Sequence, residues 1–462
     1  MQRLKSLLML MVLAMPLWAV GEQDLLRDKI LAEVTGATIS DRVVGIEKFG
    51  ARGDGRKDCK PAFDKAMKYA QRKGGARVVV PKGVWRLCGP IHLVSNVCLD
   101  LQEGAVLSFD ATPHYYLPMV ETSWEGTFLW NYSPFIYGHN LHDVAIIGKG
   151  VIDGNSADTF SAWHSQQKAG RQLSRDMNHR GAPLAERRFG EGHYLRPQLI
   201  QLYGCQRVTL EDFFMQEAPF WCVHLLCSEN VVCRGLRYDA KLTNNDGIDV
   251  ESSCNVLIED IHFNNGDDNV AIKSGRDNDG WTLASPSANI LMRRCHLKGL
   301  HGLVIGSEMS AGVENVLMED CDFAGYCKRG VYVKTNPDRG GFVRNLYINN
   351  VRLGEVLDLF YVTSQYAGEG LDNHHFTAVE NIQVNGLSAD KVNGTALVLQ
   401  GTPQKPIKNV SFRNVSVGEV QNGLSFEHTE AVTMENCFLG PRVGVPSQAS
   451  AKDGLFVNDR AK

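Results

Sequence analysis

The chain has 462 residues, of which 44% are hydrophobic and 22% are charged, which is the composition of a soluble globular protein. Its formal net charge of −4 is small for this length, so the overall charge does not point to nucleic acid or an anionic membrane surface as a partner. The function must therefore be sought in local patterns.

The first residues have the pattern of a secretory signal peptide. Arg3 and Lys5 precede a short apolar run, and small residues follow it up to Gly21. A membrane anchor is the alternative, but the run is too short to span a bilayer comfortably. We therefore expect a signal peptide over residues 1–21, a secreted or periplasmic location, and no membrane span in the mature chain.

One helix is predicted near the N-terminus, in the segment PAFDKAMKYAQRKGG. Pro61 suits a first helical turn, apolar residues follow it at helical spacing, and Gly74 and Gly75 end the helix. Beyond it the chain changes to short β-rich runs separated by Gly and Pro. This helix is expected to cap the open end of the β-structure that follows.

The β-rich runs repeat along the chain. Each repeat places an asparagine before an apolar strand, as in SENVVCRGL, SCNVLIEDI and VENVLMEDC, and successive asparagines are 25 to 36 residues apart. They are Asn230, Asn255, Asn289, Asn315, Asn345, Asn381 and Asn409. Strands at this period, without helices between them, predict an all-β fold, a right-handed parallel β-helix. An antiparallel sandwich or propeller is the alternative, but few of the Asn-Gly hairpins that it requires are present.

The asparagines have a physical explanation. Asn tolerates the left-handed backbone conformation of a tight corner, and its side chain can hydrogen-bond to the next coil.

Twelve cysteines are also present, and several fall in or beside strand-like segments. Buried free thiols are favoured over disulfides for these positions, and no paired CxxC motifs indicate a zinc site. No metal or cofactor is expected.

The segment from 156 to 198 lacks the repeat. We expect an insertion loop there, within a single catalytic β-helix domain over residues 22–462. Between Lys168 and Arg196 the loop has seven basic and three acidic side chains, although the whole chain is acidic. A solvated loop would explain this charge, but a basic loop also suits an anionic polymer as substrate. Insertions in solenoids normally gather on one face and line the binding site.

Carboxylates occur in two clusters that are one repeat apart. Asp246 lies 21 positions before the pair Asp267 and Asp268, so a coiled structure brings both clusters to one face. Adjacent carboxylates repel each other and raise the pKa of one member, which provides an acid and a base. A single such Asp could be only a turn residue. Together they suit glycosidic hydrolysis, where one acid protonates the leaving oxygen and another carboxylate activates water.

The chain resembles glycoside hydrolase family 28, the polygalacturonase family, over nearly the whole mature sequence, and these acids lie in two of the matching motifs. The Asn-x-Asp motif of the family matches Asn244 to Asp246, and its Asp-Asp motif matches Asp267 and Asp268 in GDDNVAIKSGR. The run HGLVIGSEMSAGV is most similar to exo-acting bacterial members.

Two further family motifs are matched in part. The Gly-His-Gly motif is LHG here, with His301 kept, and the Arg-Ile-Lys motif is YVK, with Lys334 kept and Tyr332 in the arginine position. The resemblance implies that Asn244 and Lys334 bind substrate. It also implies a monomeric enzyme that cleaves α-linked galacturonic acid bonds in pectin, an anionic plant polysaccharide, or in its oligosaccharides.

The resemblance further implies an inverting mechanism. Asp267 would be the general acid, Asp246 and Asp268 would hold the attacking water, and His301 would support the acids. Inversion requires carboxyl groups about 6.5 to 9.5 Å apart, which is wider than the spacing of about 4.8 Å between strands. Asp246 and Asp267 would therefore have to splay or lie diagonally.

Tyr332 is the departure that affects the substrate. Arginine holds a carboxylate with two parallel hydrogen bonds, whereas tyrosine offers one neutral donor and an aromatic face for a sugar ring. Either Lys334 acts together with Arg276 or an arginine of the basic loop, or the enzyme cleaves another pectic linkage, such as one in rhamnogalacturonan. Candidates for stacking on sugars, which buried packing would also explain, are Trp163, Phe220 and Trp221.

Two other classes stay open at this point. A pectate lyase on the same fold would use a calcium ion, but the aspartates with Lys334 favour hydrolysis and no acid-rich loop has calcium-ligand spacing. A non-catalytic β-helix that binds glycans is compatible with the fold alone.

Overall fold

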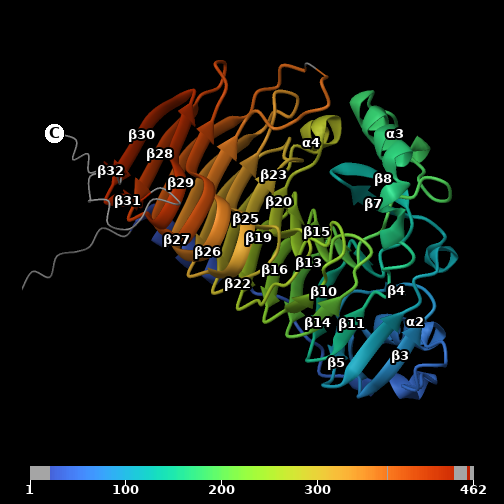
Figure 1. The fold of residues 1–462 in the computed structure, drawn as a ribbon. Helices are drawn as coiled ribbons and strands as arrows, with labels where there is room; N and C mark the ends of the chain where they lie inside the picture. The colour runs from blue at the N-terminus through green and yellow to red at the C-terminus, as the bar shows by residue number, and fades with distance from the viewer. Residues whose placement is uncertain (1–20, 372, 442–454, 458–462) are drawn as a thin grey trace, which may run out of the picture.

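The computed structural model describes residues 21–371, 373–441 and 455–457, which form a right-handed parallel β-helix (Figure 1). A typical coil contributes a strand to each of three sheets, as in β16 (Glu229–Arg234), β17 (Arg237–Asp239) and β18 (Ile248–Glu251). The next coil begins with β19 (Cys254–Glu259), which pairs in parallel with β16. The predicted fold is confirmed, while the predicted signal peptide lies, except for Gly21, outside the described residues.

The first sheet carries the repeated asparagines. Besides β16 and β19 it contains β1 (Val43–Gly45), β2 (Ala76–Val80), β5 (Val97–Leu101), β10 (His142–Ile147), β13 (Gln206–Glu211), β21 (Ser287–Arg293), β24 (Val313–Glu319), β28 (Ile407–Arg413) and β30 (Thr429–Glu435). The second sheet contains β17 with β3 (Gly83–Leu87), β6 (Ala105–Phe109), β11 (Val151–Asp153) and β14 (Phe214–Gln216), and its place in later coils is taken by β22 (His296–Leu297) and β31 (Cys437–Leu439).

The third sheet positions the site. Besides β18 it contains β4 (Ile91–His92), β9 (Ile136–His139), β12 (Ile200–Tyr203), β15 (Val223–Leu226), β20 (Asp268–Lys273) and β23 (His301–Gly306). In the later coils, single long strands run round the corners and join the sheets: β25 (Asp322–Lys334), β26 (Phe342–Thr363), β27 (Ala378–Gln400) and β29 (Ser416–Glu427). The short strand β32 (Leu455–Val457) pairs antiparallel with β31.

Inward-facing residues stack in columns because each coil repeats the register of the one before. In the first sheet one such column runs through Val231, Val256, Ile290, Val316, Leu346, Ile382 and Val410. All of them are at most 1% exposed. Alternation of inward apolar and outward polar residues therefore builds one continuous core along the helix axis.

The repeated asparagines form a ladder along the first sheet. All seven have positive φ values of 55° to 58°. From Asn255 onward, each side-chain amide donates to the side-chain oxygen of the asparagine one coil earlier, for example Asn289 to Asn255 at 3.0 Å and Asn315 to Asn289 at 3.1 Å. Both expectations for these residues, the left-handed corner and the bond to the neighbouring coil, are confirmed.

Helix α2 (Lys60–Lys73) covers the N-terminal end of the core, as predicted (Figure 1). Its buried residues follow helical spacing, and Gly74 ends it with φ +70°. A second helix, α1 (Glu22–Glu33), was not predicted. Its residue Ile30 packs on the outer face of the first sheet, among Leu257, Leu291, Leu317 and Tyr347.

The segment predicted as an insertion loop contains helix α3 (Lys168–His179) and two short 3-10 helices, η3 (Ser161–Ser165) and η4 (Leu184–Glu186). The prediction of a plain loop there was incomplete. The buried face of α3 is formed by Gly170, Ser174, Met177 and Asn178, so it has no apolar stripe that sequence periodicity could reveal.

Other elements lie near the site or the N-terminal cap. They are the hairpin of β7 (Val120–Trp124) and β8 (Thr127–Asn131), helix α4 (Asp277–Leu283), and the 3-10 helices η1 (Ile46–Phe49) and η2 (Pro113–Tyr116).

All twelve cysteines are free thiols, as expected from their place along the strands. Among the described residues no helix is long and apolar enough to cross a membrane.

Candidate active site

The predicted acids meet where strands of the third sheet begin. Asp246 precedes β18, Asp267 directly precedes β20, and Asp268 and His301 are the first residues of β20 and β23. Lys334 ends β25, one coil further along. These side chains line a pocket of about 440 Å³ together with Asn244 and Arg276. The structure therefore brings together all the predicted catalytic residues and three of the four predicted substrate-binding residues.

Buried amides fix the backbone at these acids. The side chain of Asn245 donates to the carbonyl oxygens of Ala218 and Phe220, both at 2.8 Å. The side chain of Asn265 donates to the carbonyl oxygens of Asn245, Asp267 and Asp268 at 2.9 to 3.1 Å. Because the N–H groups of these two buried amides are bonded to the backbone, they hold the segments that carry the carboxylates.

Asp268 is surrounded by donors. Oδ1 lies 2.6 Å from Nδ1 of His301, and Oδ2 lies 3.3 Å from Nζ of Lys334. Burial opposes ionisation here, but Lys334 and then the hydrogen bond with His301 outweigh it and hold the pKa of Asp268 well below its usual range. Burial also lowers the pKa of His301. A neutral His301 therefore donates its Nδ1 proton to an ionised Asp268.

Asp267 has the opposite tendency. Burial and the neighbouring charge of Asp268 raise the pKa of Asp267 to about 7. Asp267 receives a long hydrogen bond of 3.4 Å from the amide of Asn244, which in turn accepts a bond of 2.6 Å from Arg196. Arg196, a basic residue of the insertion, is fully buried and orients Asn244.

Burial also raises the pKa of Asp246 well above its ordinary value, and Asp249 and Asp267 add to this effect. Asp249 lies fully buried on β18, and neither of its carboxylate oxygens has a hydrogen-bond partner among the described residues. Its nearest cation is Lys273, whose Nζ is 3.7 Å away. Among the four aspartates Asp246, Asp249, Asp267 and Asp268, the pKa is lowered only for Asp268 and is raised for the other three.

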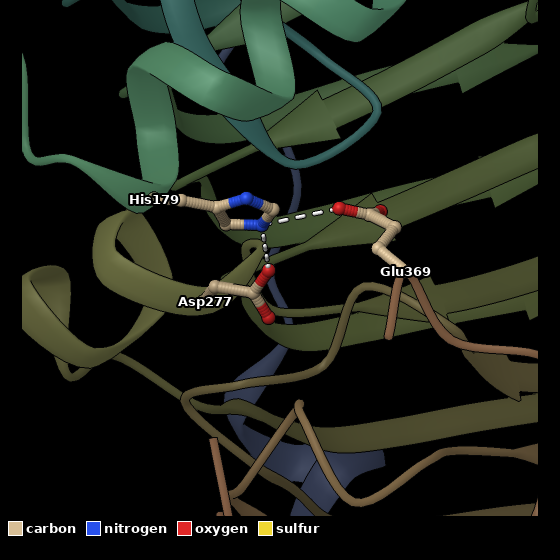
Figure 2. Close-up of side chains that lie close together, drawn as sticks. All are labelled: His179, Asp277 and Glu369. Carbon is tan, nitrogen blue, oxygen red and sulfur yellow. Dashed lines mark hydrogen bonds and ion pairs between the residues drawn. The ribbon is translucent and has the colours of Figure 1, made fainter. Parts of the chain in front are cut away.

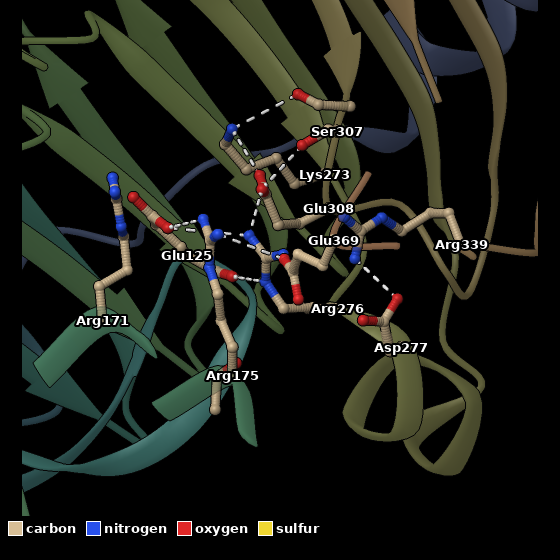
Figure 3. Close-up of polar contacts among 12 residues, drawn as sticks. Glu125, Arg171, Arg175, Lys273, Arg276, Asp277, Ser307, Glu308, Arg339 and Glu369 are labelled. Atoms are coloured by element: carbon tan, nitrogen blue, oxygen red, sulfur yellow. Dashed lines mark hydrogen bonds and ion pairs between the residues drawn. The ribbon is translucent and has the colours of Figure 1, made fainter. Parts of the chain in front are cut away.

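One end of the pocket is closed by three segments that are inserted between strands: the β7–β8 hairpin, α3 and the segment after β26 (Figure 3). At the hairpin tip, Gly126 accepts a hydrogen bond of 2.8 Å from the backbone N–H of Arg276. A Cβ at Gly126 would lie 2.7 Å from that nitrogen, and its φ is +79°, so only glycine fits this approach.

Charged side chains of both signs fill this closed end (Figure 3). Arg276 pairs with Glu308 at 2.7 Å and with Glu369, and its Nε donates to the carbonyl oxygen of Glu125. Arg175 pairs with the carboxylate of Glu125 at 3.0 Å. The closed end is therefore a network of ion pairs, held by the hairpin, α3 and the segment after β26.

A triad outside the catalytic acids has ligand types that could hold a metal ion (Figure 2). Nε2 of His179 lies 2.8 Å from Asp277 and 3.1 Å from Glu369. These carboxylates raise the pKa of His179 to about 9, and they also pair with Arg339 and Arg276. With cations already in place, the triad ties α3 to α4 and to the segment after β26, and the donor set does not suit a metal ion.

Tyr332 requires a correction. Only 5% of its surface is exposed, and it is not among the described residues that line the pocket. Arg329 lies over its ring at 4.4 Å and Lys334 at 5.5 Å, while Tyr361 packs edge-on. Its aromatic face is thus covered, and the expectation that it meets a sugar ring is wrong. The tyrosine that lines the pocket is Tyr366.

Two other expectations are refined. Arg276 lines the pocket but is 2% exposed and already paired with the carboxylates described above, so it is not free to hold a substrate carboxylate. Phe220 and Trp221 line the pocket, whereas Trp163 packs against Phe160 and Tyr132 away from it.

Sequence reasoning missed several pocket residues, namely Glu125, Lys273, Glu308, Arg339, Tyr366 and Glu369. Lys273 carried a weak signal, because it is a charged residue directly after the apolar residues of the strand DNVAIK. Glu308 lies in the run HGLVIGSEMSAGV that carried the resemblance. The other four lie on loops or at irregular positions, where no periodicity places them.

Comparison with known proteins agrees with this geometry. A model of the family described as "Glycosyl hydrolases family 28" matches residues 76–437. A probable polygalacturonase of Vitis vinifera is 30% identical over 420 residues, which is 87% of this chain and 80% of that protein. An exo-poly-alpha-D-galacturonosidase of Dickeya chrysanthemi is 27% identical over 344 residues, 68% of this chain and 56% of that protein.

A solved structure has the same architecture over almost the whole chain. The crystal structure of a hyperthermoactive exopolygalacturonase from Thermotoga maritima superposes with a TM-score of 0.85 and 33% sequence identity. The match covers 95% of this chain and 99% of that one.

Proposed function

The chain belongs to glycosyl hydrolases family 28, and from this premise we propose that it hydrolyses α-linked galacturonic acid bonds of pectin or its oligosaccharides. The action proposed is exo and inverting. The observation that carries the proposal is the pair of adjacent acids in one pocket, where His301 and Lys334 contact Asp268 and lower its pKa, while burial and Asp268 raise the pKa of Asp267.

In the proposed reaction Asp267 donates its proton to the glycosidic oxygen as the bond to the anomeric carbon breaks. A water molecule attacks that carbon from the opposite face, and its proton passes to Asp268. Asp246, which retains its own proton, holds this water by hydrogen bonding. His301 and Lys334 keep Asp268 ionised, and a neutral Asp267 with an ionised Asp268 is the starting state that the reaction requires.

The closed end of the pocket supports exo action. A chain that enters the pocket meets the hairpin tip at Glu125, α3 and Glu369 instead of an open groove. Only a chain end can then reach the acids, so the enzyme releases the terminal residue. The exopolygalacturonase and exo-galacturonosidase names of the similar proteins agree with this reading.

The test is product analysis with polygalacturonate, its short oligomers and rhamnogalacturonan fragments. We expect monomer release from galacturonates, with the inverted anomer visible by NMR in the first seconds. Retained configuration would overturn the mechanism, and cleavage of rhamnogalacturonan alone would replace the substrate. Unsaturated products that disappear with a chelator would indicate a lyase.

The proposal includes export and a monomeric state. N-terminal sequencing of the exported protein tests removal of residues 1–21, and light scattering tests the monomer. A protein that retains residue 1 after export would contradict the predicted signal peptide.

A further inference from the structure

The cations that line the pocket are nearly all neutralised by carboxylates of the protein. Lys273 pairs with Glu308 at 3.2 Å, Arg339 with Asp277 at 2.7 Å and Lys334 with Asp268 at 3.3 Å. Arg175 and Arg276 are paired as described above. Such pairs leave little positive charge for an anionic ligand, because each guanidinium or ammonium already has its counter-ion.

Arg171 is the exception. It lines the same pocket, but within the described part of the chain its guanidinium has no hydrogen-bond or ion-pair partner. Figure 3 shows its side chain extending from α3 beside Glu125, with no interaction drawn to any neighbour. A free guanidinium at the closed end of a pocket can hold a carboxylate with two parallel hydrogen bonds.

The helix that carries Arg171 is firmly placed. Asn178 of α3 donates to the carbonyl oxygen of Arg276 at 3.0 Å, and the Cα of Gly170 approaches His193 so closely that a Cβ would lie 2.2 Å from its carbonyl oxygen. Arg175 lies one turn further along on the same face of the helix and is anchored on Glu125. Arg171 is therefore an unpaired donor that a fixed helix places in the lining of the pocket.

The balance of charge favours an anion there. Six basic and six acidic side chains line the pocket, but the pKa values of Asp246 and Asp267 are raised, so these two acids are not full counter-charges. Arg171 then contributes a positive charge that is not paired with a carboxylate among the described residues. A uronate brings one negative charge for each sugar residue, which matches this charge.

We propose that Arg171 binds the C6 carboxylate of the terminal uronate and selects chain ends that carry this charge. The inference rests on the proposed exo-acting hydrolysis and adds its specificity determinant. Lys334, in contrast, is already paired with Asp268, so Arg171 is the cation that is available to the carboxylate of the terminal uronate.

The test compares Arg171→Gln with the parent protein on trigalacturonate and on two trimers that are methyl-esterified at C6 of one end only. We expect kcat/KM on trigalacturonate to fall roughly 10- to 100-fold, as for loss of a hydrogen bond to a charged group. On one of the two esterified trimers the variant and the parent should have equal kcat/KM, because that trimer lacks the carboxylate that Arg171 binds. On the other the variant should again be slower.

Two variants control for the helix. Arg171→Lys should recover part of the activity because it keeps the charge, whereas Arg180→Gln, at the exposed end of α3, should behave as the parent. An equal loss of kcat/KM in Arg171→Gln on all three trimers, or no loss of kcat/KM on trigalacturonate, would overturn the proposal. If the parent protein hydrolyses none of the trimers, the proposed function itself fails, which is a different result.

Discussion

Nδ1 of His301 lies 2.6 Å from Oδ1 of Asp268, and the two residues face each other in register on neighbouring strands. The other ring nitrogen, Nε2, is buried and has no partner within the described chain. The neutral imidazole therefore donates its one N–H to Asp268, which keeps this carboxylate in place and ionised. Lys334, one coil further, supplies the charge that makes this ionisation favourable.

Replacing Lys334 with methionine should shift the pH profile. Without the ammonium, burial raises the pKa of Asp268, so the base is protonated over more of the acid range and the acidic limb of kcat moves to higher pH. We expect kcat near pH 5 to fall by about 10- to 100-fold. Lys328→Met, on the exposed part of the same strand, is the matched control, and an unmoved acidic limb in Lys334→Met would contradict this role.

Asp267→Asn should abolish turnover and increase stability in alkaline solution. The raised pKa of Asp267 means that folding is penalised once the carboxyl ionises, so its stabilising effect is present at low pH and is lost as pH rises through about 7. The amide removes this penalty. We expect kcat to fall at least about 1000-fold, while Tm at pH 8 rises by about 2 °C or more. Full activity in this variant would remove Asp267 from its proposed role.

The alkaline limb of the parent enzyme should also report Asp267. The general acid must hold its proton, so kcat/KM should decline above a pKa of about 7 in the free enzyme. Initial rates on trigalacturonate between pH 4 and 9 measure this limb. A limb that begins near the ordinary carboxyl range, about pH 4, would show that Asp267 is ionised in the working enzyme.

Restoring the arginine of the family motif at Tyr332 should harm the protein. The ring of Tyr332 is covered by Arg329 and Lys334, so Tyr332→Arg replaces two cation–π contacts with three crowded cations. We expect the free energy of unfolding to fall by about 2 to 4 kcal/mol, and we expect no decrease in KM. Tyr332→Phe keeps the ring and should be close to neutral. A stable, tighter-binding arginine variant would mean that this site can accept a substrate carboxylate.

We expect the asparagine ladder to contribute measurably to stability. Asn289→Ala removes two ladder hydrogen bonds and places alanine at φ 56°. We expect a loss of about 2 to 4 kcal/mol from both effects. Asn289→Gly, which accepts the left-handed corner, should lose about 1 kcal/mol less. Calorimetry of the parent and the two variants separates the contribution of the hydrogen bonds from that of the backbone conformation. An equal loss of unfolding free energy in both variants would assign the whole effect to the hydrogen bonds.

The sequence was sufficient for the fold and for the acids because both follow from the repeat. The period put Asp246 and Asp268 on neighbouring coils, and asparagine at each corner fixed where each coil turns. The closed end of the pocket was not predictable in this way. Glu369 and Glu125 come from insertions that obey no period, and they meet Arg276 only through tertiary packing.

Tyr332 shows a different limit of sequence reasoning. Its place beside Lys334 can be read from the sequence, but whether its ring faces the pocket depends on Arg329 and Tyr361, which come from the same and the following coil. Helix α3 was missed for a related reason, since small and polar residues form its buried face.

The docking of α1 sets an order of events for the newly made chain. Ile30 inserts among Leu257, Leu291 and Leu317, which are synthesised more than two hundred residues later. At about 5 to 20 residues per second, the first helix must wait ten seconds or more before its binding face exists. Because Leu317 follows the catalytic acids in the chain, α1 can complete this packing only after Asp246, Asp267, Asp268 and His301 have been synthesised.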